Sequence, residues 1–271
     1  MVGSFIVEHL SRSGEPVVGV SRTARQTDGI DWIGADVTSP GIDLPKSEIV
    51  YCATDARISA MAIKSIMRCN PRRLVLFSTT GVISKMDSSD DAERAAIANI
   101  AEAERTTISA CEESEVEWTI LRPPLIYLEG RDQSITKIAD LIRKFGFMPL
   151  YGTASGLRQP VHAADAARGA IAAAMSSKAA NKVYTISGFD TISYREMVGR
   201  IFDGLGRRRL IVNLPPMLWK FAFALVKPIY PTVSPAMGER MLKDLAFDSS
   251  DAVSDFGWNP RGFAPFFQSC L

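Results

Sequence analysis

Hydroxyl and titratable side chains gather at a few points of the sequence where they could act on a substrate. The apolar run 74–77 is followed at 78–81 by three hydroxyl residues and a glycine, which is typical of a buried strand ending in a polar turn. The hydroxyl of Thr79 could orient a carbonyl group there, but a hydroxyl is a poor base. A base must lie within about 2.6 to 3.2 Å of the proton that it accepts, or work through a water. The candidates for that role are Tyr127, Glu129 and His162.

Residue spacing gives no support to two other reaction types. His162 is one of two histidines, and no second His, Cys or acid stands at ligand spacing beside it, so a metal site is not predicted. No G-x-S-x-G motif or Ser, His, Asp order indicates hydrolysis. We expect His162 to be a structural, hydrogen-bonded residue, with a catalytic role as the alternative.

Two strands and one long helix must position Thr79. Residues 74–77 and 118–121 are predicted strands, and 122–124, Arg-Pro-Pro, ends the second. Between them, 88–114 contains no Gly or Pro, has an apolar face, and carries acidic residues near its start, where a helix favours negative charge. Strand, helix and strand joined by a right-handed crossover form the unit of a parallel sheet covered on both faces.

The chain before this unit repeats the same alternation. Residues 16–20, 32–37 and 48–54 are predicted strands, and a helix over about 59–67 leads to the strand at 74–77. Strands alternating with helices predict an α/β fold with a doubly wound parallel sheet.

A family resemblance appears in the same region. FSTTGVIS at 77–84 and WTILRPPLIY at 118–127 resemble the "SSxxVYG … TILRP" region of the extended and atypical short-chain dehydrogenases, the NAD(P)-dependent epimerase/dehydratase group. The resemblance implies a Rossmann-type sheet, an NAD or NADP cofactor and a smaller C-terminal substrate lobe. It places Thr79 at the family's catalytic Ser/Thr position, and Pro123 beside the cofactor.

The family's Tyr-x-x-x-Lys pair has no counterpart in this sequence. In family members the Tyr is the general acid/base, and the Lys lowers its pKa and holds the nicotinamide ribose. The usual spacing from Arg122 puts these positions near Ala96 and Ile100, and no Tyr or Lys occurs anywhere in 88–114.

The start of the sequence resembles the end of the family's G-x-x-G-x-x-G fingerprint, with Gly3 as its third glycine. The two earlier glycines and the strand before them are absent from the sequence. In this fold that strand lies at the centre of the sheet, and about four buried side chains would contribute roughly 1.5 to 3 kcal/mol each. We therefore expect the chain to fold poorly alone and its start to be assigned too far downstream. An in-frame stop closely upstream in the coding DNA, with no Gly-rich apolar stretch, would exclude this.

Further cofactor positions follow from the resemblance. Arg22 comes just after the second family strand, where an Arg accommodates the 2′-phosphate of NADP and an acid binds the ribose of NAD. It therefore favours NADP, with a surface arginine as the alternative. Asp36 and Val37 match the residues that border the adenine, although Asp36 could equally cap a turn. Ala53 and Thr54 lie where the backbone passes beside the cofactor.

The second half of the sequence resembles the family's substrate lobe. RQPVHAADAA at 158–167 is similar to "R-x-x-VHVxD-vA", and 183–197 and 247–260 match later family segments. The expected domains are an N-terminally incomplete NAD(P)-binding domain at 1–155 and a mixed C-terminal part with the lobe at 156–271. The implied partner is a small molecule, a sugar nucleotide or a similar hydroxylated substrate.

Composition limits the class of protein. With 271 residues, 46% apolar and 23% charged, the chain can bury a sizeable core. A net charge of +1 gives no electrostatic reason to expect nucleic acid, and the basic run 207–209 is predicted to be a solvated loop. Four cysteines without C-x-x-C pairing predict reduced, buried thiols in a cytoplasmic protein.

Residues 214–226 form the most apolar segment of the later chain, but they contain two prolines and a lysine and fall short of the roughly 20 residues that span a membrane. We expect a helix of the core or lobe. An interfacial membrane helix, with Trp219 and Phe223 against Lys220 and Lys227, is the alternative. A homodimer through outer helices is also possible.

Two functions of different classes follow. The first is an NAD(P)-dependent oxidoreductase or epimerase of the epimerase/dehydratase kind. The second is a non-catalytic dinucleotide-binding sensor or assembly protein, which the missing Tyr and Lys favour. A membrane-associated reductase of a lipid is a third possibility, with 214–226 as its membrane contact.

Overall fold

The computed structural model describes residues 1–271 except 24–26, 28, 89, 216, 220–235 and 268–271. The chain divides into two compact units. Unit 1 comprises Met1–Pro123, Ala163–Ile186 and Asp248–Asn259, and unit 2 comprises Pro124–His162, Ser187–Phe247 and Pro260–Leu271. The expected boundary at residue 155 differs from this division because the chain returns to unit 1 twice.

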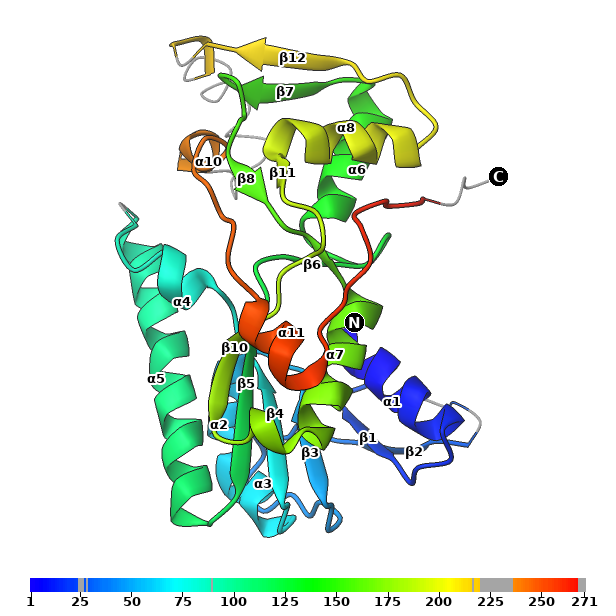
Figure 1. Cartoon of the computed structure of the whole chain (residues 1–271), viewed down its shortest axis with the longest axis vertical. Coiled ribbons are helices and arrows are strands. Elements are labelled where there is room, and N and C mark those ends of the chain that lie inside the picture. The colour runs from blue at the N-terminus through cyan, green and yellow to red at the C-terminus, as the bar shows by residue number, and fades with distance from the viewer. Residues whose placement is uncertain (24–26, 28, 89, 216, 220–235, 268–271) are drawn as a thin grey trace. The chain divides into compact units, whose positions relative to one another are not determined.

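Unit 1 is built on a four-stranded sheet with the order β10-β5-β4-β3 and parallel pairing throughout (Figure 1). Its strands are β3 (Ile49–Cys52), β4 (Arg73–Phe77), β5 (Glu117–Arg122) and β10 (Lys182–Thr185). Every residue of β4 is buried, as expected of a strand covered on both faces. This confirms the α/β doubly wound class and the strands predicted at 74–77 and 118–121.

A second, two-stranded sheet stands apart from the first in unit 1. In it, β1 (Val18–Ser21) pairs in parallel with β2 (Asp31–Gly34), and neither strand pairs with β3. Val18 is 38% exposed. Both strands are shorter than predicted, since Asp36 and Thr38 already form a turn beyond β2.

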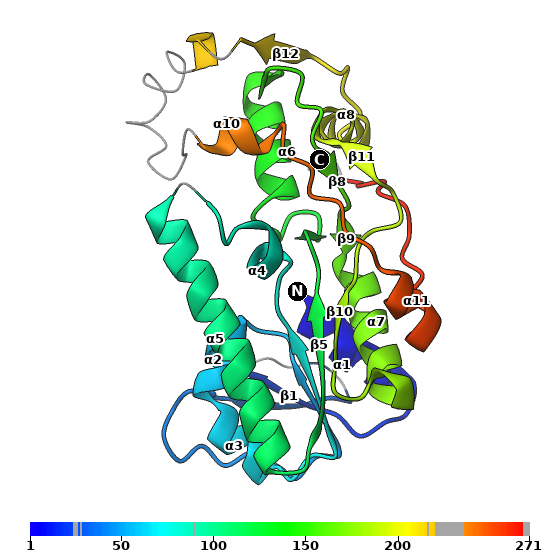
Figure 2. The same cartoon turned by 60° about the vertical axis from the view of Figure 1, so that its left-hand side comes forward.

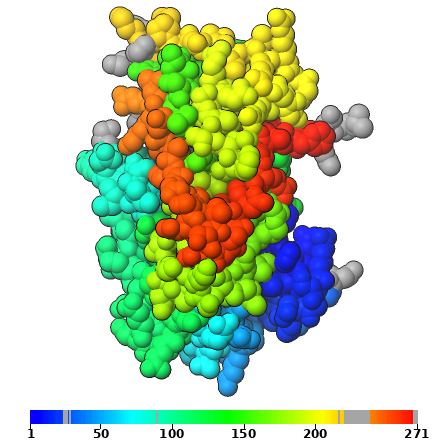
Figure 3. Space-filling model, viewed as in Figure 1, coloured from blue at the N-terminus to red at the C-terminus, as the bar shows by residue number. Residues whose placement is uncertain are grey.

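Helices cover both faces of the four-stranded sheet. The long helix α5 (Asp91–Glu113) packs on β5 and on the short helices α2 (Ala56–Met61) and α3 (Ile63–Arg68), while α7 (Ala163–Met175) packs on β4 and β5. Figure 2 shows α5 and α7 on opposite sides of β5. The remaining elements of unit 1 are α1 (Val2–Arg12), α4 (Gly81–Ser84), η1 (Ser177–Ala179) and α11 (Ser250–Phe256). Helix α1 packs on α7, and so does α11, as Figure 3 shows.

Local sequence sets the helix ends. The carboxylate of Asp90 accepts hydrogen bonds from the amides of Ala92 and Glu93 and so begins α5. Asp55 does the same for α2 through the amide of Arg57. The single helix predicted over 59–67 is instead two helices, α2 and α3, which meet at Ala62.

The side chain of Arg73 joins the sheet to the end of α7. It is 1% exposed and donates hydrogen bonds to the carbonyls of Ala173, Ala174 and Ser176 at 3.1, 2.9 and 2.5 Å. It also forms a 2.5 Å ion pair with Glu117. The last carbonyls of a helix lack intrahelical partners and carry negative partial charge, so a guanidinium there satisfies both needs.

Unit 2 is a set of small sheets around one apolar core. β6 (Ile126–Tyr127) pairs with β9 (Val161–His162), β7 (Met148–Tyr151) with β12 (Ile211–Leu214), and β8 (Leu157–Arg158) with β11 (Ile192–Ser193). The helices described in it include α6 (Ile135–Phe145), α8 (Tyr194–Gly204) and α10 (Ala236–Arg240). The hydroxyl of Ser193 caps α8 by accepting a hydrogen bond from the amide of Glu196, whose carboxylate pairs with Arg200 and Arg209.

Among the described helices, none has the length and hydropathy needed to cross a membrane. The segment 214–226 is described only in part: β12 ends at Leu214, Pro215 follows without regular structure, residues 217–219 are helical, and 216 and 220–226 lie outside the described residues. Arg207 and Arg209 of the basic run make hydrogen bonds or ion pairs within unit 2.

Candidate functional site

The predicted cofactor residues follow the carboxyl ends of the parallel strands of unit 1. Arg22 follows β1, Asp36 lies two residues beyond β2, and Ala53 follows β3. Thr79 and Pro123 follow β4 and β5 in the same way. In open parallel sheets, ligands bind outside the carboxyl ends of the strands, so these positions have the placement that a ligand site requires.

The start of α1 lies against the end of β3. A Cβ atom built on Gly3 would stand 3.4 Å from the Cβ of Ala53, which is an ordinary van der Waals contact. An alanine would therefore fit at position 3 without a steric clash. The neighbouring Thr54 shares a hydrogen bond of 3.2 Å with the hydroxyl of Ser59 in α2.

Asp36 forms a turn, which was one of its two predicted roles. Its Oδ1 atom accepts hydrogen bonds from the amide of Thr38 at 2.9 Å and from the hydroxyl of Thr38 at 2.7 Å. These bonds, together with the positive charge of Arg22, lower the pKa of the Asp36 carboxyl. Arg22 itself is exposed. Val37 is half-buried against the core of unit 1.

Thr79 is held in a tight turn between β4 and α4. Its hydroxyl oxygen accepts a hydrogen bond of 3.0 Å from the amide of Gly81, and the next amide, of Thr80, donates to the carbonyl of Pro123 at 3.2 Å. A Cβ on Gly81 would come within 2.9 Å of the terminal methyl of Ile97 on α5, so a larger residue here would require the Ile97 side chain to shift. The hydroxyl of Thr79 retains its proton for donation to a ligand.

Helix α5 presents apolar groups at the two positions where the resemblance implies Tyr and Lys. Ala96 and Ile100 are both half-buried, and the helix Asp91–Glu113 contains neither Tyr nor Lys. The charged contact between α5 and the sheet is instead an ion pair between buried Glu104 and Arg122, whose Nε donates to Oε1 at 3.0 Å. Arg122 therefore anchors the end of β5 immediately before Pro123.

The three candidate bases lie together in unit 2. The ring of Tyr127, which is 1% exposed, stands edge-on to the rings of His162 and Phe263, with centroids 5.2 and 5.0 Å apart. The Nε2 atom of His162 is 3.5 Å from Oε2 of Glu129, and the amide of Phe266 donates to Oε1 at 3.2 Å. Thr79 belongs to unit 1.

Glu129 is ionised more easily than an ordinary glutamate. Burial of this carboxyl opposes ionisation, but the hydrogen bond from His162 and those from backbone amides outweigh it, so the pKa of Glu129 is lowered. At neutral pH the pair therefore holds a carboxylate that orients the imidazole of His162.

Arg158 opens the segment predicted to feed α7, and it is buried at 8% exposure. Its guanidinium donates to the carbonyls of Leu157, Lys243 and Arg240 at 2.6, 2.9 and 2.5 Å and lies 5.2 Å above the ring of Tyr194. Burial lowers the pKa of Arg158, a cost of placing this cation among carbonyls rather than in water.

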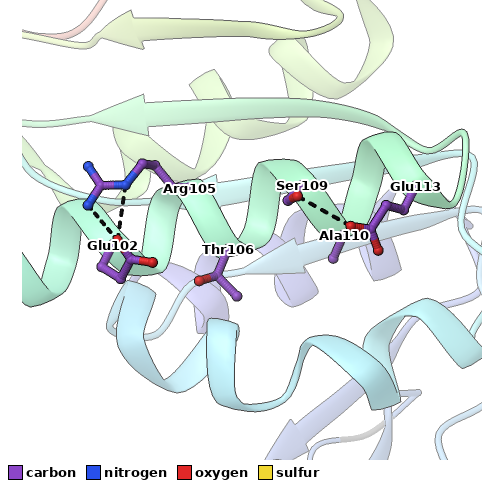
Figure 4. Close-up of a pocket in the computed structure, with 6 residues that line it drawn as sticks. All are labelled: Glu102, Arg105, Thr106, Ser109, Ala110 and Glu113. Atoms are coloured by element: carbon purple, nitrogen blue, oxygen red, sulfur yellow. Dashed lines mark hydrogen bonds and ion pairs between the residues drawn. The ribbon is translucent and has the colours of Figure 1, made fainter.

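A hollow of about 430 Å³ lies elsewhere, on the outer face of α5 (Figure 4). Its lining comes from this helix alone. Arg105 pairs with Glu102, and the hydroxyl of Ser109 donates a hydrogen bond to Glu113. It contains none of the predicted site residues. No group of His, Cys, Asp and Glu in the described part of the chain could hold a metal ion.

The cysteines behave as predicted for buried thiols. Cys52, Cys69 and Cys111 are free and buried, and Cys270 lies outside the described residues. Burial raises the pKa of Cys52 to about 11 and that of Cys111 to about 12. None of the three is therefore a thiolate nucleophile at neutral pH.

Three features of these sites were not singled out by residue type. The ion pair of Glu104 and Arg122 could have been anticipated from an acid on the otherwise apolar face of the predicted helix. Nothing in the sequence around Arg158 indicated that its side chain would be buried among backbone carbonyls. Ser78 has a buried hydroxyl with no hydrogen-bond partner among the described residues. The sequence pattern predicted a functional role for the neighbouring Thr79 and none for Ser78.

The donor groups of unit 1 fit a dinucleotide. Arg22 and the free Oδ2 of Asp36 suit an adenosine with a phosphate, and the start of α1 beside Ala53 suits a pyrophosphate, since helix starts present amide groups. The Thr79 hydroxyl and the backbone at Pro123 lie at the ends of neighbouring strands, where a nicotinamide ring would be held.

Comparisons with known proteins agree with this fit. Residues 1–142, more than half of the chain, match a family model described as NAD(P)H-binding. No curated protein matches the sequence.

Solved structures match over nearly the whole chain. The UDP-glucose 4-epimerase of Thermotoga maritima with UDP-glucose superposes with a TM-score of 0.71 at 14% identity, covering 96% of this chain and 91% of that one. The UDP-glucuronic acid 4-epimerase of Bacillus cereus with UDP-glucuronic acid and NAD gives 0.70 at 15%, covering 97% and 92%. The UDP-glucose 4-epimerase of Thermus thermophilus with NAD gives 0.68 at 16%, covering 97% and 92%. The chain thus belongs to the NAD(P)H-binding family, and its fold is that of these sugar-nucleotide epimerases.

Proposed function

We propose that this protein is an NAD(P)-dependent oxidoreductase or epimerase that acts on a sugar nucleotide. The observation that carries the proposal is the family match over 1–142 combined with the placement of Arg22, Asp36, Ala53, Thr79 and Pro123 after the carboxyl ends of parallel strands. The epimerases with the same fold were solved with UDP-sugars or NAD, which supports the substrate class.

Each cofactor residue has a separate task in this proposal. The guanidinium of Arg22 binds the 2′-phosphate of NADP, so NADP is preferred over NAD. Asp36 and Val37 border the adenine, and Gly3, Ala53 and Thr54 line the pyrophosphate. Pro123 contacts the nicotinamide half.

The bound nicotinamide supplies or accepts a hydride, and the chain must orient the substrate and move a proton. Thr79 donates its hydroxyl proton in a hydrogen bond to the substrate oxygen, and its own oxygen is fixed by the amide of Gly81. No Tyr–Lys pair is present on α5 for the proton transfer. Tyr127 and His162 stay the candidate acids and bases, with Oε2 of Glu129 3.5 Å from Nε2 of His162.

A second function has one specific observation in its favour. Helix α5 carries apolar Ala96 and Ile100 where the acid/base pair is expected. The sequence as it stands therefore also suits a dinucleotide-binding sensor or assembly protein, which needs no acid/base pair. Fold alone does not separate the two functions, because chemistry resides in the site.

Calorimetry with NADPH and NADH, followed by turnover assays on UDP-sugars, tests both functions. The proposal expects tighter binding of NADPH, a preference that Arg22→Asp reverses, and turnover that Thr79→Val lowers without changing dinucleotide affinity. Thr106→Val, an exposed threonine on α5, is the matched control. Binding without turnover would establish the second function, and absence of dinucleotide binding would exclude both.

A further inference from the structure

The outer side of the β7–β12 pair in unit 2 is apolar. Met148 and Leu150 of β7 point into the core, so the alternation of a strand turns Phe147 outward. Its neighbours on β12 are Leu210 and Val212, because the amide of Met148 donates to the carbonyl of Leu210 at 2.9 Å and Val212 pairs with Pro149. Phe147, Leu210 and Val212 are 43%, 49% and 44% exposed.

A second aromatic ring extends this surface. Phe145 ends α6, is 50% exposed, and has its ring centroid 6.5 Å from that of Phe147. Gly146 between them takes a left-handed conformation with φ of 76°, which lets the helix stop and the strand begin within one residue. We call the four side chains of Phe145, Phe147, Leu210 and Val212 the outer patch.

The described elements of unit 2 pack on the other side of these strands. Ile142 of α6 and Ile201 and Phe202 of α8 share the core with Met148 and Leu150, and Figure 1 shows α6 and α8 on that side, with the opposite side of β7 and β12 turned outward. A contiguous group of exposed large apolar side chains indicates an interaction surface rather than random exposure.

Cationic groups border the outer patch. The Nζ atom of Lys144 lies 5.3 Å above the ring of Phe145, and Arg207 donates to the carbonyls of Ile142 and Arg143 at 3.0 and 3.1 Å, which fixes its charge at the end of α6. Arg208, next in the sequence, is exposed. Asp140 pairs with Arg143 and Asp203 with Arg209, and Arg207 and Arg208 add two positive charges to this border.

We infer that the outer patch docks on the surface of an anionic lipid bilayer. The four apolar side chains enter the boundary between headgroups and acyl chains, while Lys144, Arg207 and Arg208 meet the lipid phosphates. Long cationic side chains can keep their stems along the apolar surface and their charges at the headgroups. A second copy of the chain fits less well, because a two-fold contact through this patch would bring the same cations against each other.

Cosedimentation of the full chain with vesicles tests the inference. Vesicles of phosphatidylcholine with about one third phosphatidylserine are compared with vesicles of phosphatidylcholine alone, at low and high salt. We expect binding to the anionic vesicles only, weakened by salt because surface charges are screened. The double variant Phe145→Ser, Phe147→Ser should lose the binding, and Arg208→Glu should lower the affinity at least about fivefold, the equivalent of one charge near the surface.

Two matched variants separate the patch from general effects. Phe189→Ser removes a phenylalanine of unit 2 outside the patch that is more exposed than either patch phenylalanine, and Arg131→Glu reverses an exposed charge of the same unit. Both should bind vesicles as the unchanged chain does. Should the double phenylalanine variant not fold, Arg208→Glu and Leu210→Ser, each at an exposed position, decide the question.

The inference is overturned if the unchanged chain ignores anionic vesicles, or if patch and control variants bind them equally. It is also overturned if the chain is a dimer that the patch variants dissociate and vesicles do not compete for, since the patch would then be an interface between copies. None of these readouts depends on dinucleotide binding.

Discussion

The strands of unit 1, which form two separate sheets, fall into two groups that differ in how many partner strands and how much burial they have. In one group, β4 and β5 each have a parallel partner on both edges, helices on both faces and almost wholly buried side chains. In the other group, β1 pairs only with β2 and β3 only with β4, and their residues are mostly half-exposed. The same alternation of strand and helix therefore produces a closed half and an open half. The two halves differ in the number of hydrogen-bonded partner strands. A strand with a partner on each edge is buried by those neighbours as well as by the packing of its own apolar residues.

The largest expected difference between the halves is in core truncation. Leu76→Ala in β4 should lower the free energy of unfolding by about 2 to 5 kcal/mol, because the side chain is fully buried and leaves a cavity. Val20→Ala in β1, which is half-exposed, should cost less than about 1 kcal/mol. Urea denaturation of both variants measures this, and equal losses would contradict the comparison.

The next effect tests the polar anchor of the closed half. Arg73→Ala leaves the last carbonyls of α7 without their donor and should cost about 3 kcal/mol, since unsatisfied buried groups are expensive. Its neighbour Arg72 is half-exposed and pairs with Glu48 and Glu117, so Arg72→Ala should cost less than about 1 kcal/mol. Thermal unfolding of the two variants distinguishes a specific anchor from a general charge effect.

Amide hydrogen exchange compares the halves without substitution. The amides of β4 should exchange only through global unfolding, while those of β1 should exchange through local opening, because that strand has one partner and exposed residues. A protection difference of at least about tenfold is expected. Uniform protection across β1 and β4 would show that the open half is as stable as the closed one.

Thiol chemistry gives the smallest effect. Cys52 ends β3 at the open edge, whereas Cys111 lies in α5 over the closed half, and both pKa values are raised by burial, to about 11 and about 12. The folded state holds these thiols protonated, so their contribution to stability is full below the ordinary pKa of about 9 and is lost as pH rises through the folded values. Alkylation in dilute denaturant should label Cys52 before Cys111, and mass spectrometry of the labelled peptides checks the order.

The closed half could be predicted from the sequence because each of its signals is local. The apolar run 74–77 and the Gly- and Pro-free stretch 88–114 each define one element, and Asp90 caps α5 where acids were expected. The same reasoning placed Arg22 and Thr79 after strand ends, whereas Asp36 was predicted inside a strand over 32–37 and lies beyond the end of β2. The absence of Tyr and Lys from this helix could also be read from the sequence, because it concerns a single element.

Other features depend on distant pairs that residue types do not reveal. Arg73 appeared as an ordinary strand residue, yet its partners lie about one hundred positions later. The end of β2 lies earlier than predicted because the Asp36 turn takes the backbone that a longer strand would use. The roles of Tyr127, Glu129 and His162 depend on contacts with Phe263 and Phe266, from the far end of the chain, and stay predictions.

The bonds from Arg73 to Ala173, Ala174 and Ser176 also bear on how this chain matures on the ribosome. When β4 leaves the exit tunnel, the acceptors for its guanidinium have not been synthesised, and β10 and the segment Asp248–Asn259 come later still. Unit 1 therefore cannot complete its packing until residues 248–259 have been synthesised. Until β10 has been synthesised, the edge of β5 that it covers has no partner strand, and such an unpaired edge is open to wrong pairing with other chains.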